Sequence, residues 1–225
     1  MQCSSTFSRF SNSCETFLEN KILNVAHMEF IAVECINSTE GVNSTQLIQF
    51  YANIPLGKGK LAEKSKKWSS HQPEDIPESI LVLVIDSASR TELFRNLPRT
   101  MEFLTKNLSF IDFKGHHPIG EPTLRNMAPF LFGLPYEVFL KDSGKDWINS
   151  WDAAPFIWKV FDQLHYVTGY SEDLPRMATF NYARQQGFVR QPVDLYLRPL
   201  MRAHETSSAG QEQVVCRITT FIFFN

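Results

Sequence analysis

Short apolar runs alternate along the chain with polar segments of helical period. The clearest run covers residues 80–85, "ILVLVI", which is continuous and rich in β-branched residues, as in strands buried on both faces. Residues 28–36 also predict a strand, whereas residues 45–54 fit either a strand or a helix. Residues 108–115, "LSFIDFKG", alternate between apolar and polar side chains, which predicts a half-buried strand.

Two helices are predicted directly after the first of these runs. Ser89 is a good N-cap for a helix that starts at Arg90. Pro98 suits the first turn of a second helix, whose Met101 and Leu104 fall on one face. The apolar run therefore leads through a short turn into a pair of helices.

Further along, the loop "HHPIGEP" precedes another helical segment. Thr123 is expected at its N-cap and Gly133 just after its end, with a kink at Pro129. A helix over residues 155–164 then precedes a short strand at 166–170. Strands that alternate with helices predict an α/β fold with a mainly parallel sheet.

The remaining segments suggest how the chain is organised. Residues 57–79 are polar, first basic and then acidic, and contain two prolines, which favours an exposed linker. We expect residues 1–75 to form an amino-terminal extension and linker, residues 76–200 the main domain, and residues 201–225 a divergent tail.

Composition narrows the function classes. The net charge of -2 argues against a nucleic-acid-binding protein, which usually carries a strong basic excess. No apolar run approaches the roughly 20 residues that a membrane-spanning helix needs, so no transmembrane segment is expected.

Cysteines and glycosylation sequons bear on location. None of the four cysteines forms a CxxC pair, which gives no support for a zinc ribbon or a thioredoxin-like motif. Sequons at Asn37, Asn43 and Asn107 predict N-glycosylation, and with an even cysteine count they favour an extracellular or lumenal parent protein. The first thirty residues show no signal-peptide pattern.

Asp86 is the first candidate for chemistry, because a strand that only fills a core does not need a carboxylate at its tip. Ligands of parallel α/β sheets bind beyond the carboxyl ends of the strands, where Asp86 is expected. A carboxylate there could hold a divalent metal ion. The plainer alternative is that Asp86 caps the helix that follows.

Thr123 is the second candidate, at the expected start of a helix. Helix N-termini favour anions such as phosphate or sulfate, and a threonine hydroxyl becomes a nucleophile once a metal or base activates it. Simple capping is again the alternative. Four other residues lie in loops or after a predicted strand and fit solvated positions at least as well as a metal site: His116, His117, Glu172 and Asp173.

The order of buried strand, terminal acid, helix, loop, hydroxyl residue and helix resembles the amino-terminal half of the alkaline-phosphatase and sulfatase superfamily. Within it, the chain resembles a group of animal extracellular proteins, domain of unknown function 229. The resemblance covers roughly residues 80–200 and lies in "LVLVIDSASRTELFRNLPRTMEFL", "GEPTLRNMAPFLFGLP" and "PFIWKVFDQLHYVTGYSEDLPRMATFNYARQQGFVRQPVDLYLRPL".

This resemblance implies an α/β/α sandwich of the alkaline-phosphatase kind. It implies that Asp86 is the first metal-ligand acid and Thr123 the nucleophile, which would form a covalent phospho-threonine. Ser87 stands where many sulfatases have a second acid, and Leu124 follows Thr123 in place of a Cys-x-Pro-x-Arg signature. The pattern is thus more similar to phosphatases and phosphoethanolamine transferases, with zinc or a similar divalent metal as cofactor.

The resemblance stops near Leu200. Superfamily members complete their metal site with an Asp-His-Gly motif that this sequence lacks. We therefore expect a fragment, truncated at the carboxyl end and inactive as given, of a metal-dependent hydrolase or transferase acting on phosphate or sulfate esters. The alternative is a non-catalytic extracellular binding or interaction protein that retains the fold.

Overall fold

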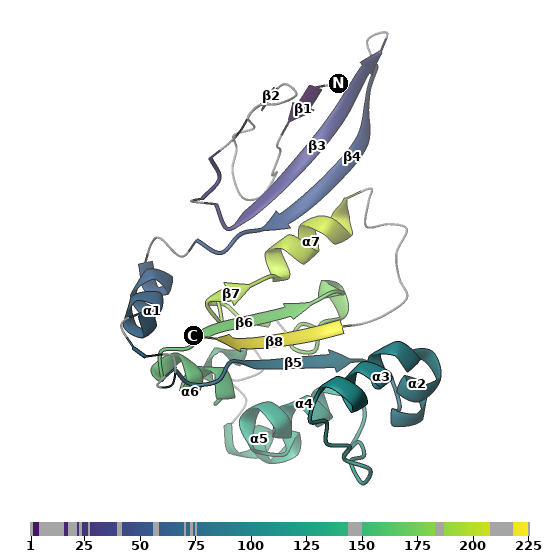
Figure 1. Cartoon of the computed structure of the whole chain (residues 1–225), viewed down its shortest axis with the longest axis vertical. Coiled ribbons are helices and arrows are strands. Elements are labelled where there is room, and N and C mark those ends of the chain that lie inside the picture. The colour runs from purple at the N-terminus through teal and green to yellow at the C-terminus, as the bar shows by residue number, and fades with distance from the viewer. Residues whose placement is uncertain are drawn as a thin grey trace.

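The chain has a mixed α/β fold, as the sequence predicts. The computed structural model describes residues 2–4, 16–17, 22, 24–26, 28–39, 42–55, 59–69, 71–72, 74, 76–143, 150–182, 187–207 and 218–224. These residues form two four-stranded sheets, one built from the amino-terminal part and the other from the rest of the chain (Figure 1).

The amino-terminal sheet is antiparallel throughout. Its strand order is β2 (Thr16–Phe17), β1 (Gln2–Ser4), β3 (Phe30–Thr39) and β4 (Val42–Ala52). The strand expected at residues 28–36 is confirmed as β3. The ambiguous segment at residues 45–54 is a strand, because β4 pairs with β3 along almost its whole length.

The second sheet holds the candidate site at its edge. Its order is β5 (Ile80–Ile85), β8 (Ile218–Phe224), β6 (Val167–Glu172) and β7 (Leu195–Tyr196). β8 is antiparallel to both β5 and β6, so these two strands run in the same direction, and β7 is parallel to β6. Val84 and Glu172 are both paired with Thr219, so the carboxyl ends of β5 and β6 lie at the same edge.

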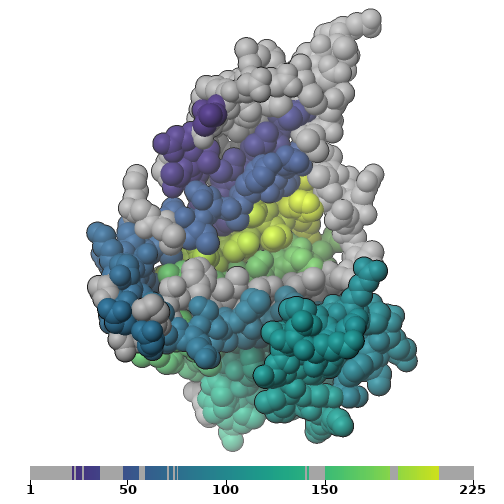
Figure 2. Space-filling view, in the orientation of Figure 1, coloured from purple at the N-terminus to yellow at the C-terminus, as the bar shows by residue number. Residues whose placement is uncertain are grey.

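Seven α-helices surround the sheets in the described part of the chain: α1 (Gly59–Ser69), α2 (Arg90–Asn96), α3 (Pro98–Asn107), α4 (Thr123–Phe132), α5 (Tyr136–Ser143), α6 (Ile157–Gln163) and α7 (Arg198–Thr206). Helices α2 to α5 lie along the β5 side (Figure 1). Helix α7 lies between the sheets, and the space-filling view shows its yellow atoms against the blue atoms of β4 (Figure 2). The ring of Phe50 on β4 meets that of His204 on α7 at 5.5 Å.

Local signals explain where the helices begin and end. The Ser89 side chain accepts a hydrogen bond from the Glu92 backbone N–H at 3.2 Å, which confirms the predicted cap of α2. Pro98 occupies the first turn of α3, and Gly133 ends α4 with a left-handed φ of 72°. One expectation is wrong by a residue: Pro122 is the N-cap of α4, and Thr123 is its first helical residue.

Aromatic side chains dominate the core. Trp151, Phe156, Trp158 and Phe180 are almost completely buried. The Phe156 ring stacks on Trp158 with centroids 3.9 Å apart and meets Phe180 edge-on at 5.0 Å. This cluster packs the loops around α6 against α4 and one face of the second sheet.

Two strand predictions need correction. Val82 and Val84 on β5 pack against the core, but Leu81 and Leu83 are 65% and 58% exposed. β5 is therefore buried on one face only, because the core packs against the face that carries Val82 and Val84. The strand expected at residues 108–115 does not form: this segment is an irregular loop.

That loop is held to α2 by an ion pair instead of a strand ladder. The Arg90 guanidinium donates to both Asp112 oxygens, with Nε 2.8 Å from Oδ1 and 3.0 Å from Oδ2. These hydrogen bonds keep the pKa of the Asp112 carboxyl below its ordinary value and raise the pKa of Arg90.

Among the described residues, no helix is both long enough and apolar enough to cross a membrane.

Candidate functional site

A hydroxyl and a carboxylate that are distant in the sequence meet at the carboxyl end of β5. Thr123 Oγ1 donates a hydrogen bond to Asp86 Oδ1 at 3.3 Å, across 37 residues of sequence. Asp86 directly follows β5, and Thr123 opens α4. Both side chains are partly exposed, so the structure brings the two predicted site residues together where a ligand can reach them.

The turn that follows Asp86 has an unusual backbone conformation. Ser87 has a φ of 58°, in the left-handed region that side-chain-bearing residues rarely adopt. Such a conformation costs roughly 1–2 kcal/mol for a residue other than glycine and occurs often at functional sites. Here it reverses the chain between the tip of β5 and Ser89, the cap of α2.

The amino end of α4 provides a favourable environment for an anion. The first turn of a helix directs backbone N–H groups outwards and carries the positive end of the helix dipole. The first turn of α4 contains no acidic residue. Arg125 lies in it, and its guanidinium Nε is 3.0 Å from Glu137 Oε1 on α5, with both side chains about half exposed.

The loop that leads into Thr123 is tied to α4 by Asn126. Asn126 Oδ1 accepts hydrogen bonds from the backbone N–H groups of Ile119 at 2.7 Å and Gly120 at 3.2 Å. Asn126 Nδ2 donates to Gly120 O at 2.7 Å. The sequence reasoning missed this residue. An asparagine one helical turn after a candidate nucleophile, close to a glycine in the preceding loop, is the signal that could have revealed it.

Comparison with known families gives one match. The family model described as "Protein of unknown function (DUF229)" matches residues 4–220. The chain belongs to the DUF229 family. The match begins at the last residue of β1 and ends within β8, so most of both sheets of this DUF229 chain lies within the family region. No curated protein and no solved structure matches the chain.

The Asp86–Thr123 pair of this DUF229 chain does not supply the ligands that the implied zinc ion needs. Asp86 and Thr123 offer one carboxylate and one hydroxyl, whereas zinc is usually held by three or four protein ligands that include histidine or cysteine. Within the described residues, no group of three or more His, Cys, Asp or Glu side chains comes together to hold a metal ion. The pair alone therefore does not make a zinc site.

The other four candidate residues lie outside the Asp86–Thr123 pair. His116 and His117 are exposed, and His117 Nδ1 lies 3.1 Å from Gly115 O. Glu172 is used within the fold, since its Oε1 accepts from the Thr179 N–H at 2.8 Å and the Thr179 hydroxyl at 2.7 Å. Asp173 is exposed.

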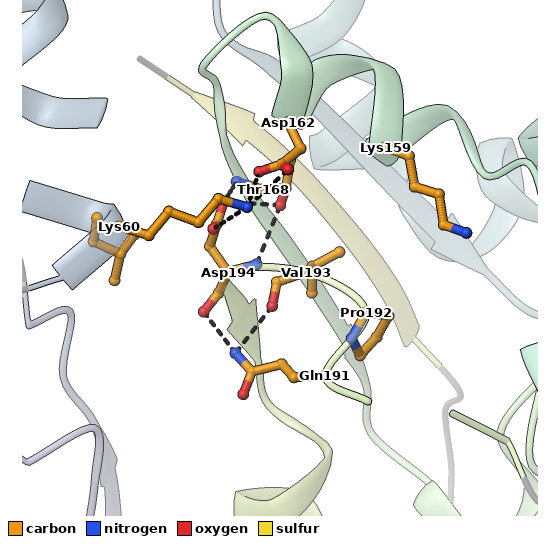
Figure 3. Close-up of a pocket in the computed structure, with 9 residues that line it drawn as sticks. Lys60, Lys159, Asp162, Thr168, Gln191, Pro192, Val193 and Asp194 are labelled. Carbon is orange, nitrogen blue, oxygen red and sulfur yellow. Dashed lines mark hydrogen bonds and ion pairs between the residues drawn. The ribbon is translucent and has the colours of Figure 1, made fainter. Parts of the chain in front are cut away.

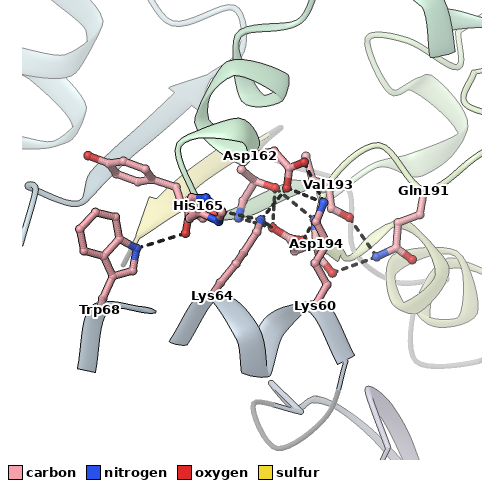
Figure 4. A network of polar contacts seen from close by, with 10 residues as sticks. Lys60, Lys64, Trp68, Asp162, His165, Gln191, Val193 and Asp194 are labelled. Carbon is pink, nitrogen blue, oxygen red and sulfur yellow. Dashed lines mark hydrogen bonds and ion pairs between the residues drawn. The ribbon is translucent and has the colours of Figure 1, made fainter. Parts of the chain in front are cut away.

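The opposite edge of the same sheet holds a second polar cluster, around Lys64. The predicted exposed linker is in part helix α1, and Lys64 on this helix is only 3% exposed. Its Nζ donates to Asp162 Oδ1 and to Tyr166 O, both at 2.6 Å, and also to Asp194 Oδ2 (Figure 4). An ammonium has three N–H donors, so these contacts satisfy Lys64 fully.

The acidic partners of Lys64 are also well supported. Asp194 Oδ2 accepts from the Thr168 N–H at 2.9 Å and from its hydroxyl at 3.0 Å, beside a cavity of about 440 Å³ (Figure 3). Burial raises the pKa of Asp162, but the hydrogen bonds from Lys60 and Lys64 prevail, so this pKa lies below its ordinary value. This saturated cluster fastens α1 to the sheet.

The predicted glycosylation sites lie in different elements. Asn37 is in β3, where it is paired with Ser44, and Asn43 is in β4, where it is paired with Ser38. Asn107 is the last residue of α3 and is exposed. Their glycosylation stays a prediction.

Proposed function

We propose that this DUF229 chain is part of an enzyme that hydrolyses or transfers phosphate or sulfate esters. In this enzyme Thr123 is the nucleophile and Asp86 is its partner. The observation that carries the proposal is the 3.3 Å hydrogen bond from Thr123 Oγ1 to Asp86 Oδ1 at a strand end. The helix N-terminus beside it favours the negative charge that such esters bring.

The chemistry assigned to these residues is a displacement at phosphorus. Thr123 Oγ1 attacks the phosphorus atom while its proton passes to Asp86 Oδ1, which already accepts that hydrogen bond. An O–P bond forms to Thr123 and the bond to the leaving-group oxygen breaks, with that oxygen taking a proton from water. Water or an acceptor alcohol then attacks the phosphoryl group and loses a proton to the hydroxide left in the first step. The O–P bond to Thr123 breaks, and Asp86 returns the proton that it holds to Thr123 Oγ1.

The finer parts of the proposal concern the cofactor, the architecture and the location. A divalent cation, zinc by resemblance, would take oxygen ligands from Asp86 and Thr123 and needs further donors beside this pair. An alkaline-phosphatase-like α/β/α sandwich with a mainly parallel sheet is supported by the shared direction of β5, β6 and β7. We further propose an extracellular or lumenal location, with glycans on Asn37, Asn43 and Asn107.

Turnover assays with matched variants test this function. Aryl phosphate, phosphate diester and aryl sulfate substrates are offered to the full-length parent protein, with and without added zinc. Thr123→Val and Asp86→Asn should each abolish turnover and lower the zinc bound per chain. Thr105→Val is the control, because the Thr105 hydroxyl bonds to the helix carbonyls of Met101 and Glu102 on α3.

The outcomes separate the two classes of function. Turnover that survives Thr123→Val would rule out the assigned nucleophile. A folded protein that binds neither zinc nor these esters would favour the alternative, a non-catalytic extracellular binding protein.

A further inference from the structure

The loop before Thr123 has little apolar burial to hold it in place. Ile119 is 69% exposed, and the other residues of 115–122 are also exposed except Gly120, which is partly buried. Hydrophobic packing therefore does not fix the path by which the chain enters α4. Core packing holds the buried face of α4, but the path of the loop into Thr123 depends on other contacts.

Asn126 supplies those contacts with one side chain. Its amide group accepts from the N–H groups of Ile119 and Gly120 and donates to Gly120 O, as a neighbouring backbone would. Gly120 also lies against the stem of Arg125, since a Cβ atom at this position would come within 3.1 Å of Arg125 Cδ. The first turn of α4 thus binds the loop that leads into it.

We infer that Asn126 positions Thr123 against Asp86 by holding the loop at residues 119–120. The inference rests on the proposed function, because it assigns a role within the same site. Thr123 lies between the held loop and the residue that holds it, only three positions before Asn126. Asn126 is a positioning residue: it bonds to the loop backbone, while the hydrogen bond to Asp86 comes from Thr123.

Hydrogen exchange tests the first step. In Asn126→Ala, the amides of Ile119 and Gly120 should exchange at least tenfold faster than in the wild type. Asn126→Asp keeps an acceptor oxygen for both N–H groups and should restore most of the protection. Asn96→Ala is the matched control, because Asn96 is an exposed helical asparagine bonded to Glu92 on its own helix.

A double-mutant cycle tests the second step without any need for enzymatic turnover. The coupling between Asp86→Asn and Thr123→Val, measured from unfolding equilibrium constants, should be roughly threefold in the wild type and close to one in Asn126→Ala. A purely structural role for Asn126 would lower the stability of all four members equally and leave this coupling unchanged.

The outcomes are distinct from those of the proposed function. Unchanged coupling in Asn126→Ala, or amides of residues 119 and 120 that stay protected, overturns the positioning role even if Thr123 proves to be the nucleophile. If Asn126→Ala fails to fold, Asn126→Leu and Asn126→Asp are compared in its place. Equal coupling in these two variants then overturns the inference.

Discussion

The two edges of the second sheet carry polar clusters of opposite character. At the carboxyl edge, Thr123 and Asp86 are partly exposed and share one hydrogen bond of 3.3 Å. At the amino edge, Lys64 is buried and donates three short hydrogen bonds, two of them to Asp162 and Asp194. All three donors of the Lys64 ammonium are used by the protein itself.

This difference separates a structural role from a chemical one. A buried charge whose donors are all satisfied fixes one element to another and has no capacity left for a ligand. The Asp86–Thr123 pair is partly exposed and lies beside a helix N-terminus, which favours an anionic ligand. We therefore assign anchoring of α1 to the Lys64 cluster, and the chemistry at the Asp86–Thr123 pair stays a proposal.

The largest effect on stability should come from Lys64. Lys64→Ala removes the buried ammonium that donates to the Asp194 carboxylate and leaves it with the more distant Lys60, 3.9 Å away, which should lower the unfolding free energy by about 3–5 kcal/mol. Lys60→Ala is the control. Because the Lys60 side chain is 61% exposed, this substitution should lower the unfolding free energy by less than about 1 kcal/mol. Equal losses in the two variants, measured by urea unfolding, would show that Lys64 is not an anchor.

A smaller loss is expected at Thr168, which is 1% exposed. Thr168→Val keeps the shape but removes the hydroxyl that donates to Asp194 Oδ2 and accepts from the Asp194 N–H at 3.1 Å. The expected cost is about 1–3 kcal/mol of unfolding free energy. A neutral substitution in the same urea experiment would mean that this hydroxyl does not support the cluster.

Substitutions at the carboxyl edge should hardly change stability. Asp86→Asn and Thr123→Val should each shift the unfolding free energy by no more than about 1 kcal/mol, because both side chains are partly exposed and share one hydrogen bond. Thermal unfolding of these two variants, measured together with Lys64→Ala, compares the stability losses at the two edges directly. A loss at Asp86 as large as that at Lys64 would remove the distinction between the two edges.

The smallest effect concerns protonation at the amino edge. Lys60→Gln removes one of the two donors that lower the pKa of Asp162, so this pKa should rise towards its ordinary value in an NMR titration. Because the folded pKa is depressed, the stability that this carboxylate contributes is present above its unfolded pKa. It is lost as the pH falls through the folded pKa. An unchanged pKa would mean that Lys64 alone sets it.

Local sequence signals predicted much of the fold. The caps at Ser89 and Gly133 and the strand at residues 80–85 follow from short-range rules that the structure obeys. The superfamily resemblance, and not the local pattern alone, implies that Asp86 and Thr123 share one site. The hydrogen bond between them confirms that they meet and leaves their roles as predictions.

Other features depend on tertiary contacts that a linear pattern does not show. Lys64 sits in a basic run that resembles a solvated surface, and only its acidic partners, about 100 residues away, make its burial possible. The continuous apolar run at residues 80–85 predicts that Leu81 and Leu83 are buried, because such a run does not show which face of the strand stays uncovered. Asn126 was missed because its role lies in bonds to the loop backbone.

The most direct test of the central claim is a search for a phosphoryl group on Thr123. The full-length parent protein is incubated with an aryl phosphate and a divalent cation, quenched in acid and mapped by mass spectrometry. We predict phosphorylation at Thr123 in the wild type, a reduced yield in Asp86→Asn, and an unmodified position in Thr123→Val. An unmodified Thr123 in the wild type while the ester is consumed would contradict the account.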